Sequence, residues 1–243
     1  MSNNKIPILV YHSIENVPKS TKMRSMHVAP KRFKFQMMLL KMMGYKGLSM
    51  RELKPYIDGQ KTGKVVGITF DDGYKNNLVN AAPVLLKYGF SATCYLVQGR
   101  IGSYNAWDIK KNLPKISLMS SNDIFEWIEA GMDIGAHSLT HPNLTKIDKL
   151  KASIEIEKCK LNLENEFNIK LEDFCYPYGC FDDDIANITS KAGFSSAVTM
   201  NRGRASIYSN RFALPRIPIT HHTLPHLFVA KIISGYEDKK KRS

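Results

Sequence analysis

The sequence is poor in cysteine and has no long apolar run, and both absences narrow the class of protein. Its four cysteines in 243 residues include no Cys-x-x-Cys pair, so neither a disulfide framework nor a cysteine zinc site is expected. No stretch approaches the roughly 20 apolar residues of a membrane-spanning helix. The first residues also lack the charged and apolar regions of a secretory signal. We therefore expect reduced thiols and a cytoplasmic protein.

Internal repeats, low-complexity blocks and Gly/Ser linkers are also missing, which favours one domain over several. Apolar residues make up 43% of the chain and charged residues 23%, as in an ordinary globular protein that can bury a large core. We expect a single domain over residues 1–243. Its core should span about 6–219, and a solvated basic tail should occupy about 236–243.

Acidic residues are scarce relative to basic ones. The chain has 35 Lys and Arg against 22 Asp and Glu, a formal net charge of +13. This excess favours an anionic partner, such as a phosphate-bearing substrate or, weakly, the anionic inner face of a membrane. No nucleic-acid reader motif accompanies the charge, so nucleic-acid binding is not expected.

Strand-like and helix-like segments alternate along the chain. The alternation predicts a mostly parallel sheet with covered faces, either an open doubly wound sheet or a barrel. Helices are expected from Pro30 to Gly44, over 76–88, from an N-cap at Ser121 to Gly131, over about 147–161 and over 182–192. Strands are expected at 6–10, 64–70, 92–97, 133–136, 171–176, 195–199 and 212–219.

Two adjacent carboxylates, Asp71 and Asp72, follow the strand expected at 64–70 and precede Gly73. Side chains alternate across a strand, so neighbouring aspartates would normally face opposite ways. A bend at the strand end, which Gly73 permits, would bring both to one side. One carboxylate could then hold a cation while the other accepts a proton. A plain Asp-Gly turn is the alternative.

His137 and His141 follow a second short strand. Pro142 disfavours a helical conformation at His141, so a loop or a single turn is expected with both imidazoles facing one way. An aspartate and two histidines form a plausible set of ligands for a divalent metal, with room left for water. In parallel barrels the chemistry lies at the carboxyl ends of strands, which is where these residues stand.

A third polar cluster, Tyr-Pro-Tyr-Gly at 176–179, ends another strand candidate. It has two interpretations. It could be a tight turn that only closes the strand. It could instead aim the backbone N–H of Tyr178 at a developing oxyanion, with the rings of Tyr176 and Tyr178 as a wall that faces a sugar.

The three clusters occur in order as Thr-Phe-Asp-Asp-Gly, His-Ser-Leu-Thr-His and Tyr-Pro-Tyr-Gly. With them the chain resembles the polysaccharide deacetylases that carry the NodB homology domain, carbohydrate esterase family 4. Residues 7–14 resemble the branch whose members begin with Pro-x-Leu-x-Tyr-His-x-Ile. The resemblance extends over about residues 6–219, which is nearly the whole chain.

This resemblance implies a distorted (β/α) barrel with about seven parallel strands. It also implies that Asp72, His137 and His141 bind a divalent metal ion, usually zinc. Asp71 would be the general base, and the Tyr178 backbone N–H would hold the oxyanion together with the metal. The implied activity is metal-dependent hydrolysis of the N-acyl group of an amino sugar or glycan.

The chain departs from the family pattern at Cys175. The common motif has an arginine two residues before the proline, where it orients the base, and a thiol cannot form a bidentate pair with a carboxylate. We hypothesise that Arg216, on the last strand candidate, supplies the guanidinium to Asp71. An arginine on the surface is the alternative interpretation.

The general acid is a second open point. The family uses a histidine in a Leu-x-His segment near the end, and Ile219-Thr220-His221 is a loose match. We therefore assign His221 as the acid. His12, at the end of the first strand, is another candidate for this role and a candidate contact for the substrate.

Two classes of function remain after these points. The first is an enzyme, a metal-dependent N-deacetylase. The second is a catalytically inactive protein on the same fold that binds a carbohydrate or polyanion. Because the Asp71, Asp72, His137 and His141 set is complete, the sequence favours the enzyme. Its substrate is expected to be an N-acetylated sugar, with an intracellular lipid-linked or nucleotide-linked sugar suited to the basic charge.

Overall fold

Parallel strands form the centre of the protein in a computed structural model, which describes residues 5–111 and 114–239. They belong to one sheet, and each strand pairs with its neighbours in parallel. The strands are β1 (Ile8–Tyr11), β2 (Lys46–Leu48), β3 (Val65–Phe70), β4 (Thr93–Leu96), β5 (Asp133–Ala136), β6 (Asp173–Cys175), β7 (Ser196–Arg202) and β8 (Leu214–Pro218).

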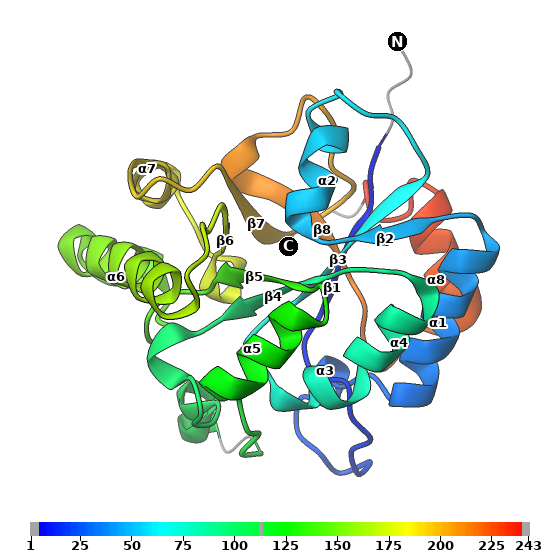
Figure 1. The fold of residues 1–243 in the computed structure, drawn as a ribbon, viewed down its shortest axis with the longest axis horizontal. Coiled ribbons are helices and arrows are strands. Elements are labelled where there is room, and N and C mark those ends of the chain that lie inside the picture. The colour runs from blue at the N-terminus through cyan, green and yellow to red at the C-terminus, as the bar shows by residue number, and fades with distance from the viewer. Residues whose placement is uncertain (1–4, 112–113, 240–243) are drawn as a thin grey trace.

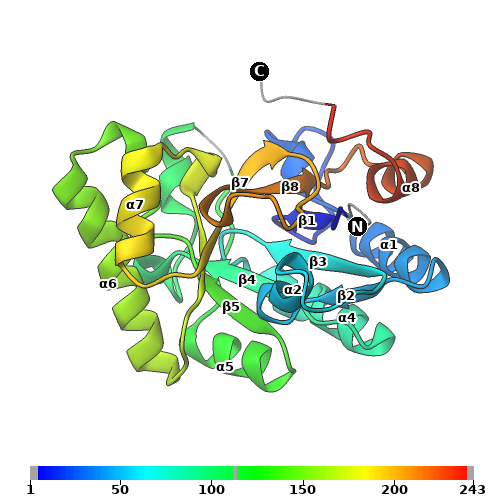
Figure 2. The same cartoon turned by 90° about the horizontal axis from the view of Figure 1, so that it is seen from above.

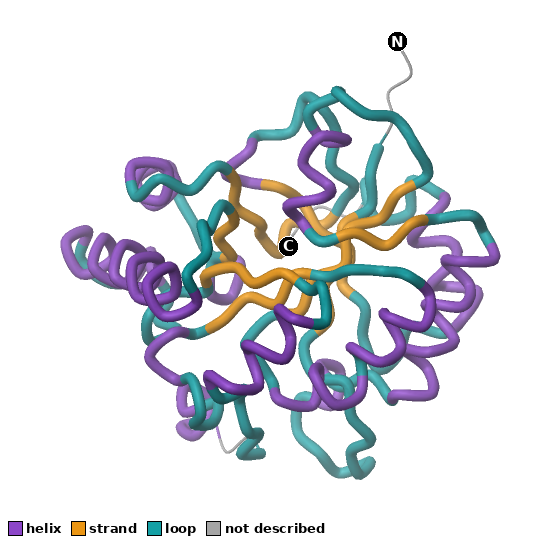
Figure 3. The backbone as a smooth tube through the Cα atoms, in the orientation of Figure 1, coloured by secondary structure: helices purple, strands orange, loops and turns teal. Residues whose placement is uncertain are grey.

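The sheet closes into a barrel because β1 pairs with both β8 and β3. Around the barrel the order is β1-β8-β7-β6-β5-β4-β3, and β2 is added outside on β3. At the closure Ile8 aligns with Gly67 and Tyr11 with Phe70. Figure 1 and Figure 3 show the strands in the centre with the helices around them. The prediction of a (β/α) barrel with about seven parallel strands is confirmed.

Most of the helices form an outer layer around the barrel. Figure 2 shows α6 and α7 on one side of the barrel and α1 and α8 on the opposite side. None of the helices in the described ranges is both long enough and apolar enough to span a membrane. The helices are α1 (Pro30–Met42), α2 (Met50–Ile57), α3 (Lys75–Asn80), α4 (Ala82–Tyr88), α5 (Ser121–Glu129), α6 (Lys149–Phe167), α7 (Asp183–Lys191) and α8 (Pro225–Ile233).

Alternation of side chains along the strands divides the apolar core in two. One buried cluster fills the barrel and includes Tyr95 and Cys175, together with Leu53 from α2. The alternate residues of the same strands, such as Phe174 and Tyr176, belong to a larger cluster under the outer helices. Residues that continue the inward set past a strand end therefore face the carboxyl-terminal mouth of the barrel.

The predicted strands are all present, with bounds that differ by at most three residues. The single helix predicted over 76–88 is wrong, because α3 ends at Asn80 and α4 begins at Ala82. Pro83 lacks the N–H that a continuous helix would need at this point. The N-cap predicted at Ser121 is off by one residue, although α5 begins at Ser121 itself. Ser120 is the N-cap of α5 and forms a capping box with Asp123.

One strand and two α-helices of the structure are absent from the sequence prediction: β2, α2 and α8. β2 has three residues and contains Gly47, so it carries almost no periodic signal. α2 contains Pro55, which argues against a helix in the sequence. α8 begins at Pro225, after the expected end of the core. The Phe228 side chain of this helix is fully buried, so the core extends beyond residue 219.

The basic tail predicted over 236–243 begins too early. Glu237 is fully buried and accepts hydrogen bonds from Arg202 and Lys231. Asp238 pairs with Arg204 at 2.8 Å. Opposite charges in a partly buried setting hold these residues on the barrel, so they are part of the folded chain. Residues 240–243 lie outside the described ranges, and the tail prediction is not tested there.

Close packing between β5 and β4 gives a test of the barrel interior. A Cβ atom at Gly135 would lie 2.5 Å from the Tyr95 ring and 3.1 Å from the Asp173 carbonyl oxygen. We expect Gly135→Ala to lower the free energy of unfolding by about 1–3 kcal/mol, because the rigid ring must move. Urea denaturation measures the change. Gly235→Ala, whose Cβ has its nearest neighbour at 3.8 Å, serves as the control and should stay within about 0.5 kcal/mol. Equal stabilities for both variants would contradict this packing.

Candidate active site

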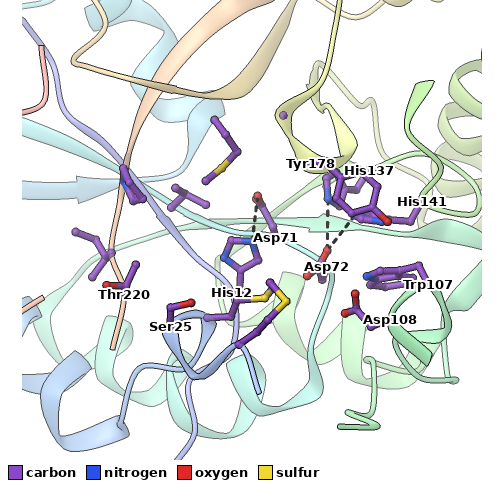
Figure 4. Close-up of a pocket in the computed structure, with 17 residues that line it drawn as sticks. His12, Ser25, Asp71, Asp72, Trp107, Asp108, His137, His141, Tyr178 and Thr220 are labelled. Carbon is purple, nitrogen blue, oxygen red and sulfur yellow. Dashed lines mark ion pairs between the residues drawn. The ribbon is translucent and has the colours of Figure 1, made fainter. Parts of the chain in front are cut away.

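A cavity of about 320 Å³ lies at the carboxyl-terminal mouth of the barrel. This volume is at the lower end of the range for small-molecule sites, roughly 300–1,000 Å³. The residues labelled in Figure 4 come from loops that follow several strands, and they converge on this space. The cavity is lined by six residues that the sequence marked as candidates: His12, Asp71, Asp72, His137, His141 and Tyr178.

Backbone conformations that are unfavourable for side-chain-bearing residues gather around the cavity. Six non-glycine residues in the described ranges have positive φ, and four of them line the cavity. They include Asp72 (φ 74°), His141 (φ 66°) and Tyr178 (φ 60°). Such residues cost on the order of 1–3 kcal/mol each and persist only where the surrounding structure enforces them. Strain therefore concentrates where the candidate site residues are held in place.

The left-handed conformation of Asp72 explains how two adjacent aspartates face one cavity. Asp71 continues the inward-facing set of β3, and Asp72 would face outward if the strand continued. Its positive φ, followed by a positive φ at Gly73, turns the carboxylate inward as well. Both carboxylates are almost fully buried. The bend that the sequence predicted is present.

Asp72, His137 and His141 bring three metal-ligating atoms together. Asp72 Oδ1 lies 3.5 Å from His137 Nε2 and 3.4 Å from His141 Nε2, as the dashed lines in Figure 4 mark. Ligands at ~2.0–2.1 Å from a tetrahedral ion lie roughly 3.3–3.4 Å apart. The spacing therefore fits one divalent ion held by one carboxylate and two imidazoles, and the cavity leaves space for further ligands.

Neighbouring groups fix the orientation of both imidazole rings in a way that suits metal binding. His137 Nδ1 lies 2.7 Å from the Cys175 carbonyl oxygen, so Nδ1 carries the proton of the neutral ring. The lone pair of Nε2 is then free to coordinate a metal ion. The His141 ring stacks on Trp107 with 4.5 Å between centroids and meets the Tyr178 ring edge-on at 4.6 Å. Burial lowers the pKa of His141, which favours the neutral imidazole that a metal ion requires.

A second group, Asp71, His137 and Cys175, also has metal-ligating atoms close together. Arg216 contacts two of its three members: its Nη2 donates to Asp71 Oδ2 at 2.7 Å and lies 3.3 Å from Cys175 Sγ. A guanidinium in this position repels a cation. The Asp72 group is therefore the better metal site.

Arg216 and Asp71 form a bidentate ion pair inside the barrel. Arg216 Nη1 donates to Asp71 Oδ1 and Nη2 to Asp71 Oδ2, each at 2.7 Å. The guanidinium is fully buried, and its Nε donates to the Thr199 carbonyl oxygen at 2.9 Å. Nη1 also donates to Thr69 Oγ1 at 3.1 Å. The pair places Asp71 in one orientation, and Cys175, at the position of the family arginine, packs against the same guanidinium.

These contacts determine the charge of the two carboxylates. Burial raises the pKa of Asp71, but the charge and hydrogen bonds of Arg216 outweigh it and hold the pKa below its usual range. Burial also raises the pKa of Asp72. The neighbouring imidazoles of His137 and His141 outweigh that effect and bring the pKa well below its usual range. Both carboxylates are ionised at neutral pH despite their burial.

The structure places His12 in the cavity and His221 outside it. His12 Nε2 lies 4.0 Å from Asp71 Oδ2, at the end of β1. His221 does not line the cavity, although Thr220 before it does. Partial burial lowers the pKa of His221, and the charges of Arg24 and Arg32 lower it further. This position does not support the assignment of His221 as the general acid.

Of the two tyrosines of the 176–179 turn, one lines the cavity and the other does not. Tyr176 is fully buried, its hydroxyl donates to the Phe212 carbonyl oxygen, and its ring stacks on Phe181. Its assignment to substrate binding is therefore wrong. The reason is alternation, since Cys175 faces the barrel interior and Tyr176 faces the outer helices. Tyr178 lines the cavity with its side chain partly exposed.

Trp107 and Asp108 are among the residues of the cavity wall that sequence reasoning missed. They come from a short 3₁₀ helix after β4, Ala106–Lys111. Asp108 is buried and accepts a hydrogen bond from Asn105 Nδ2 at 3.2 Å. The one available signal was a tryptophan in a segment without strand or helix periodicity. That signal is too weak to indicate a contact with His141.

A double-mutant cycle tests the buried pair. We expect Arg216→Met and Asp71→Ala each to lower the free energy of unfolding by about 3–5 kcal/mol, because each leaves an unpaired buried charge. The double variant should be more stable than the sum of the two losses predicts, with a coupling of about 0.5–3 kcal/mol. Urea denaturation of the four proteins gives these values.

The matched control is the exposed pair of Lys149 and Asp184, which lie 2.6 Å apart. Its coupling should be below about 1 kcal/mol, because solvent screens both charges. A buried pair with no larger coupling than the surface pair would contradict the account of Arg216.

Comparisons with known proteins agree with this arrangement. The sequence profile of the family described as polysaccharide deacetylase matches residues 58–197. YxkH of Bacillus subtilis is 29% identical over 218 residues, which cover 89% of this chain and 72% of that protein. The poly-beta-1,6-N-acetyl-D-glucosamine N-deacetylase of Staphylococcus aureus is 27% identical over 233 residues, 90% of this chain and 76% of that protein.

Among solved structures, the Streptococcus pyogenes deacetylase PplD in complex with acetate is similar in both fold and sequence. The TM-score is 0.83 at 26% identity, and the match covers 95% of this chain and 99% of that chain. The family profile spans more than half of the sequence, and the motifs that carry the resemblance line one cavity. The chain belongs to the polysaccharide deacetylase family.

Proposed function

We propose that the protein is a metal-dependent N-deacetylase that hydrolyses the N-acyl group of an amino sugar or glycan. One observation carries the proposal. A carboxylate oriented by a buried arginine, Asp71, stands beside the cluster of Asp72, His137 and His141 in one cavity. This combination supplies a base and a cation site a few ångströms apart, which amide hydrolysis needs.

Asp72, His137 and His141 would hold the ion. A divalent metal bound there supplies Lewis-acid activation, by polarising the acyl carbonyl and lowering the pKa of a bound water. Zinc is the ion that we propose, because two imidazoles and one carboxylate are a common zinc set with an open position. The bond from His137 to the Cys175 carbonyl oxygen fixes the ring so that Nε2 faces the site.

Asp71 would be the general base. Arg216 occupies one direction at each of its oxygens, which leaves the remaining lone pairs to accept a proton from water in the cavity. The ion pair also keeps the carboxylate from rotating, so it faces the attacked carbonyl. Its lowered pKa means that the base is already ionised at the pH of the reaction.

His12 would be the general acid in place of His221. An amine leaves only after it gains a proton, so a donor must stand near the scissile C–N bond. The imidazole of His12 lines the cavity next to Asp71, whereas that of His221 does not. We assign the backbone N–H of Tyr178 to the developing oxyanion, because the turn that carries it borders the metal cluster.

An N-acetylated sugar is the substrate class that we propose. The Staphylococcus aureus relative is named for an N-acetylglucosamine polymer, and the PplD structure contains acetate. The rings of Trp107 and Tyr178 on the cavity wall suit the apolar faces of a sugar ring. A catalytically inactive binding protein on the same fold is not favoured, because the four residues that catalysis would need line one cavity. They are Asp71, Asp72, His137 and His141.

The Asp71→Asn substitution tests the role of the general base separately from metal binding. We expect acetate release from N-acetylglucosamine oligomers to fall by about 10²–10⁴-fold, because the amide cannot accept the proton. One equivalent of zinc should remain bound, since Asp71 is not among the proposed ligands. His141→Ala should instead lose both metal and activity. Acetate assays and elemental analysis on the same samples give the two readouts, and an active Asp71→Asn variant would reject the assignment.

The pH profile of His12→Gln tests the acid. An acid must be protonated to act, so wild-type kcat should fall as the pH rises through its pKa. The variant should lose about 10²–10⁴-fold in kcat and no longer show this alkaline decline. His221→Gln is the matched comparison and should keep the wild-type profile. An alkaline decline that disappears in His221→Gln and persists in His12→Gln would reverse the assignment.

A further inference from the structure

A cluster of basic side chains borders one end of the cavity. Arg24 and Arg32 both lie within electrostatic reach of the His221 imidazole. The backbone N–H of His221 donates to the Ser25 carbonyl oxygen at 3.1 Å, which joins the loop after β1 to the loop after β8. We call Arg24, Arg32 and His221 the basic rim.

The basic rim is continuous with the cavity. Ser25 and Thr220, the chain neighbours of Arg24 and His221, both line it. Figure 4 shows these two residues at the end opposite Trp107 and His141, with His12 and Asp71 between the ends. A sugar at the metal cluster would therefore extend a neighbouring substituent or residue toward the basic rim.

The two guanidinium groups lack partners of opposite charge. Within the described ranges, no ion pair involves Arg24 or Arg32. Arg24 Nε and Arg32 Nη1 are also buried without a hydrogen-bond partner from the protein. A buried donor on a charged group is costly when it is unpaired, about 1–3 kcal/mol or more. The arrangement costs stability unless an acceptor fills the space.

The start of α1 adds a second unfavourable feature. The first turn of this helix holds Lys31 and Arg32 and no acidic residue, and the N-cap Ala29 offers no side-chain hydrogen bond. A helix N-terminus carries a partial positive charge, so cations there are destabilising and anions are favoured. Local preferences that a sequence breaks without compensation are expected at functional sites. An anion beside Arg32 would therefore be favoured both by the side chain and by the helix N-terminus.

We propose that the basic rim is an anion subsite, which recognises a phosphate or carboxylate group carried by the sugar substrate next to the acylated position. The proposal rests on the proposed function in one respect, that the cavity holds the N-acetylated sugar. Arg24 and Arg32 would pair with the anionic oxygens, and the partial positive charge at the start of α1 would add to the attraction. The preferred substrate would then be an anionic amino sugar rather than a neutral chitin-like oligomer.

Calorimetric titration with three sugars tests this subsite. The probes are N-acetylglucosamine, N-acetylglucosamine 6-phosphate and N-acetylmuramic acid, which are neutral, phosphate-bearing and carboxylate-bearing. Zinc-loaded Asp71→Asn protein is used throughout so that the probes persist. We expect at least one anionic sugar to bind tenfold or more tightly than the neutral one, and the tighter of the two identifies the anionic group.

The double change Arg24→Gln with Arg32→Gln should bring the affinities for the three sugars within twofold of one another. Its melting temperature should stay equal or rise, because two unpaired charges are removed. The control removes two charges from the opposite end of the barrel, Lys61→Gln with Lys191→Gln, and should keep the preference. Equal affinities before any change, or a preference that survives in the arginine variant, would overturn the subsite.

Acetate release by the wild-type protein is measured separately, so the two proposals fail in different ways. A preference for the anionic sugars without acetate release would reject the deacetylase and support the subsite. Acetate release from neutral and anionic sugars with equal kcat/KM and equal affinity would support the deacetylase and reject the subsite.

Discussion

The buried pair of Arg216 and Asp71 is the interaction on which the arrangement of the cavity depends. It joins β8 to the end of β3 across the interior of the barrel, and Arg216 also contacts Thr199 and Cys175 on the strands between. Desolvation of two charges costs several kcal/mol, and only good geometry with further hydrogen bonds repays it. The bidentate contact at 2.7 Å provides that geometry and keeps Asp71 ionised beside Asp72, His137 and His141.

Strained backbone gives the rest of the cavity its shape. Asp72, His141 and Tyr178 all adopt positive φ, so each side chain leaves the direction that its strand or loop would otherwise impose. The stability of the closed barrel, whose interior is packed around Tyr95 and Cys175, offsets the cost of these unfavourable conformations. A rigid scaffold thus supports a few unfavourable conformations at one end, which is the usual place for function in parallel barrels.

Much of the fold could be predicted from sequence, because alternating apolar segments with glycine or proline at their ends fix the order of strands and helices. Asp71, Asp72, His137 and His141 stand at strand ends, where position along the chain nearly determines position in space. The side on which a residue faces was harder to predict. Tyr176 and Tyr178 are two residues apart, yet only Tyr178 lines the cavity, and the basic surroundings of His221 depend on contacts between distant loops.

The central claim is that one divalent ion, held by Asp72 and the two histidines, is needed for Asp71 to act as a base. Acetate release from an N-acetylglucosamine oligomer tests it, with protein first stripped by a chelator and then titrated with zinc. Activity should be absent without metal and should rise in proportion to bound zinc, reaching its maximum at one equivalent. Full activity in the stripped protein, or no acetate with one ion bound, would contradict the account.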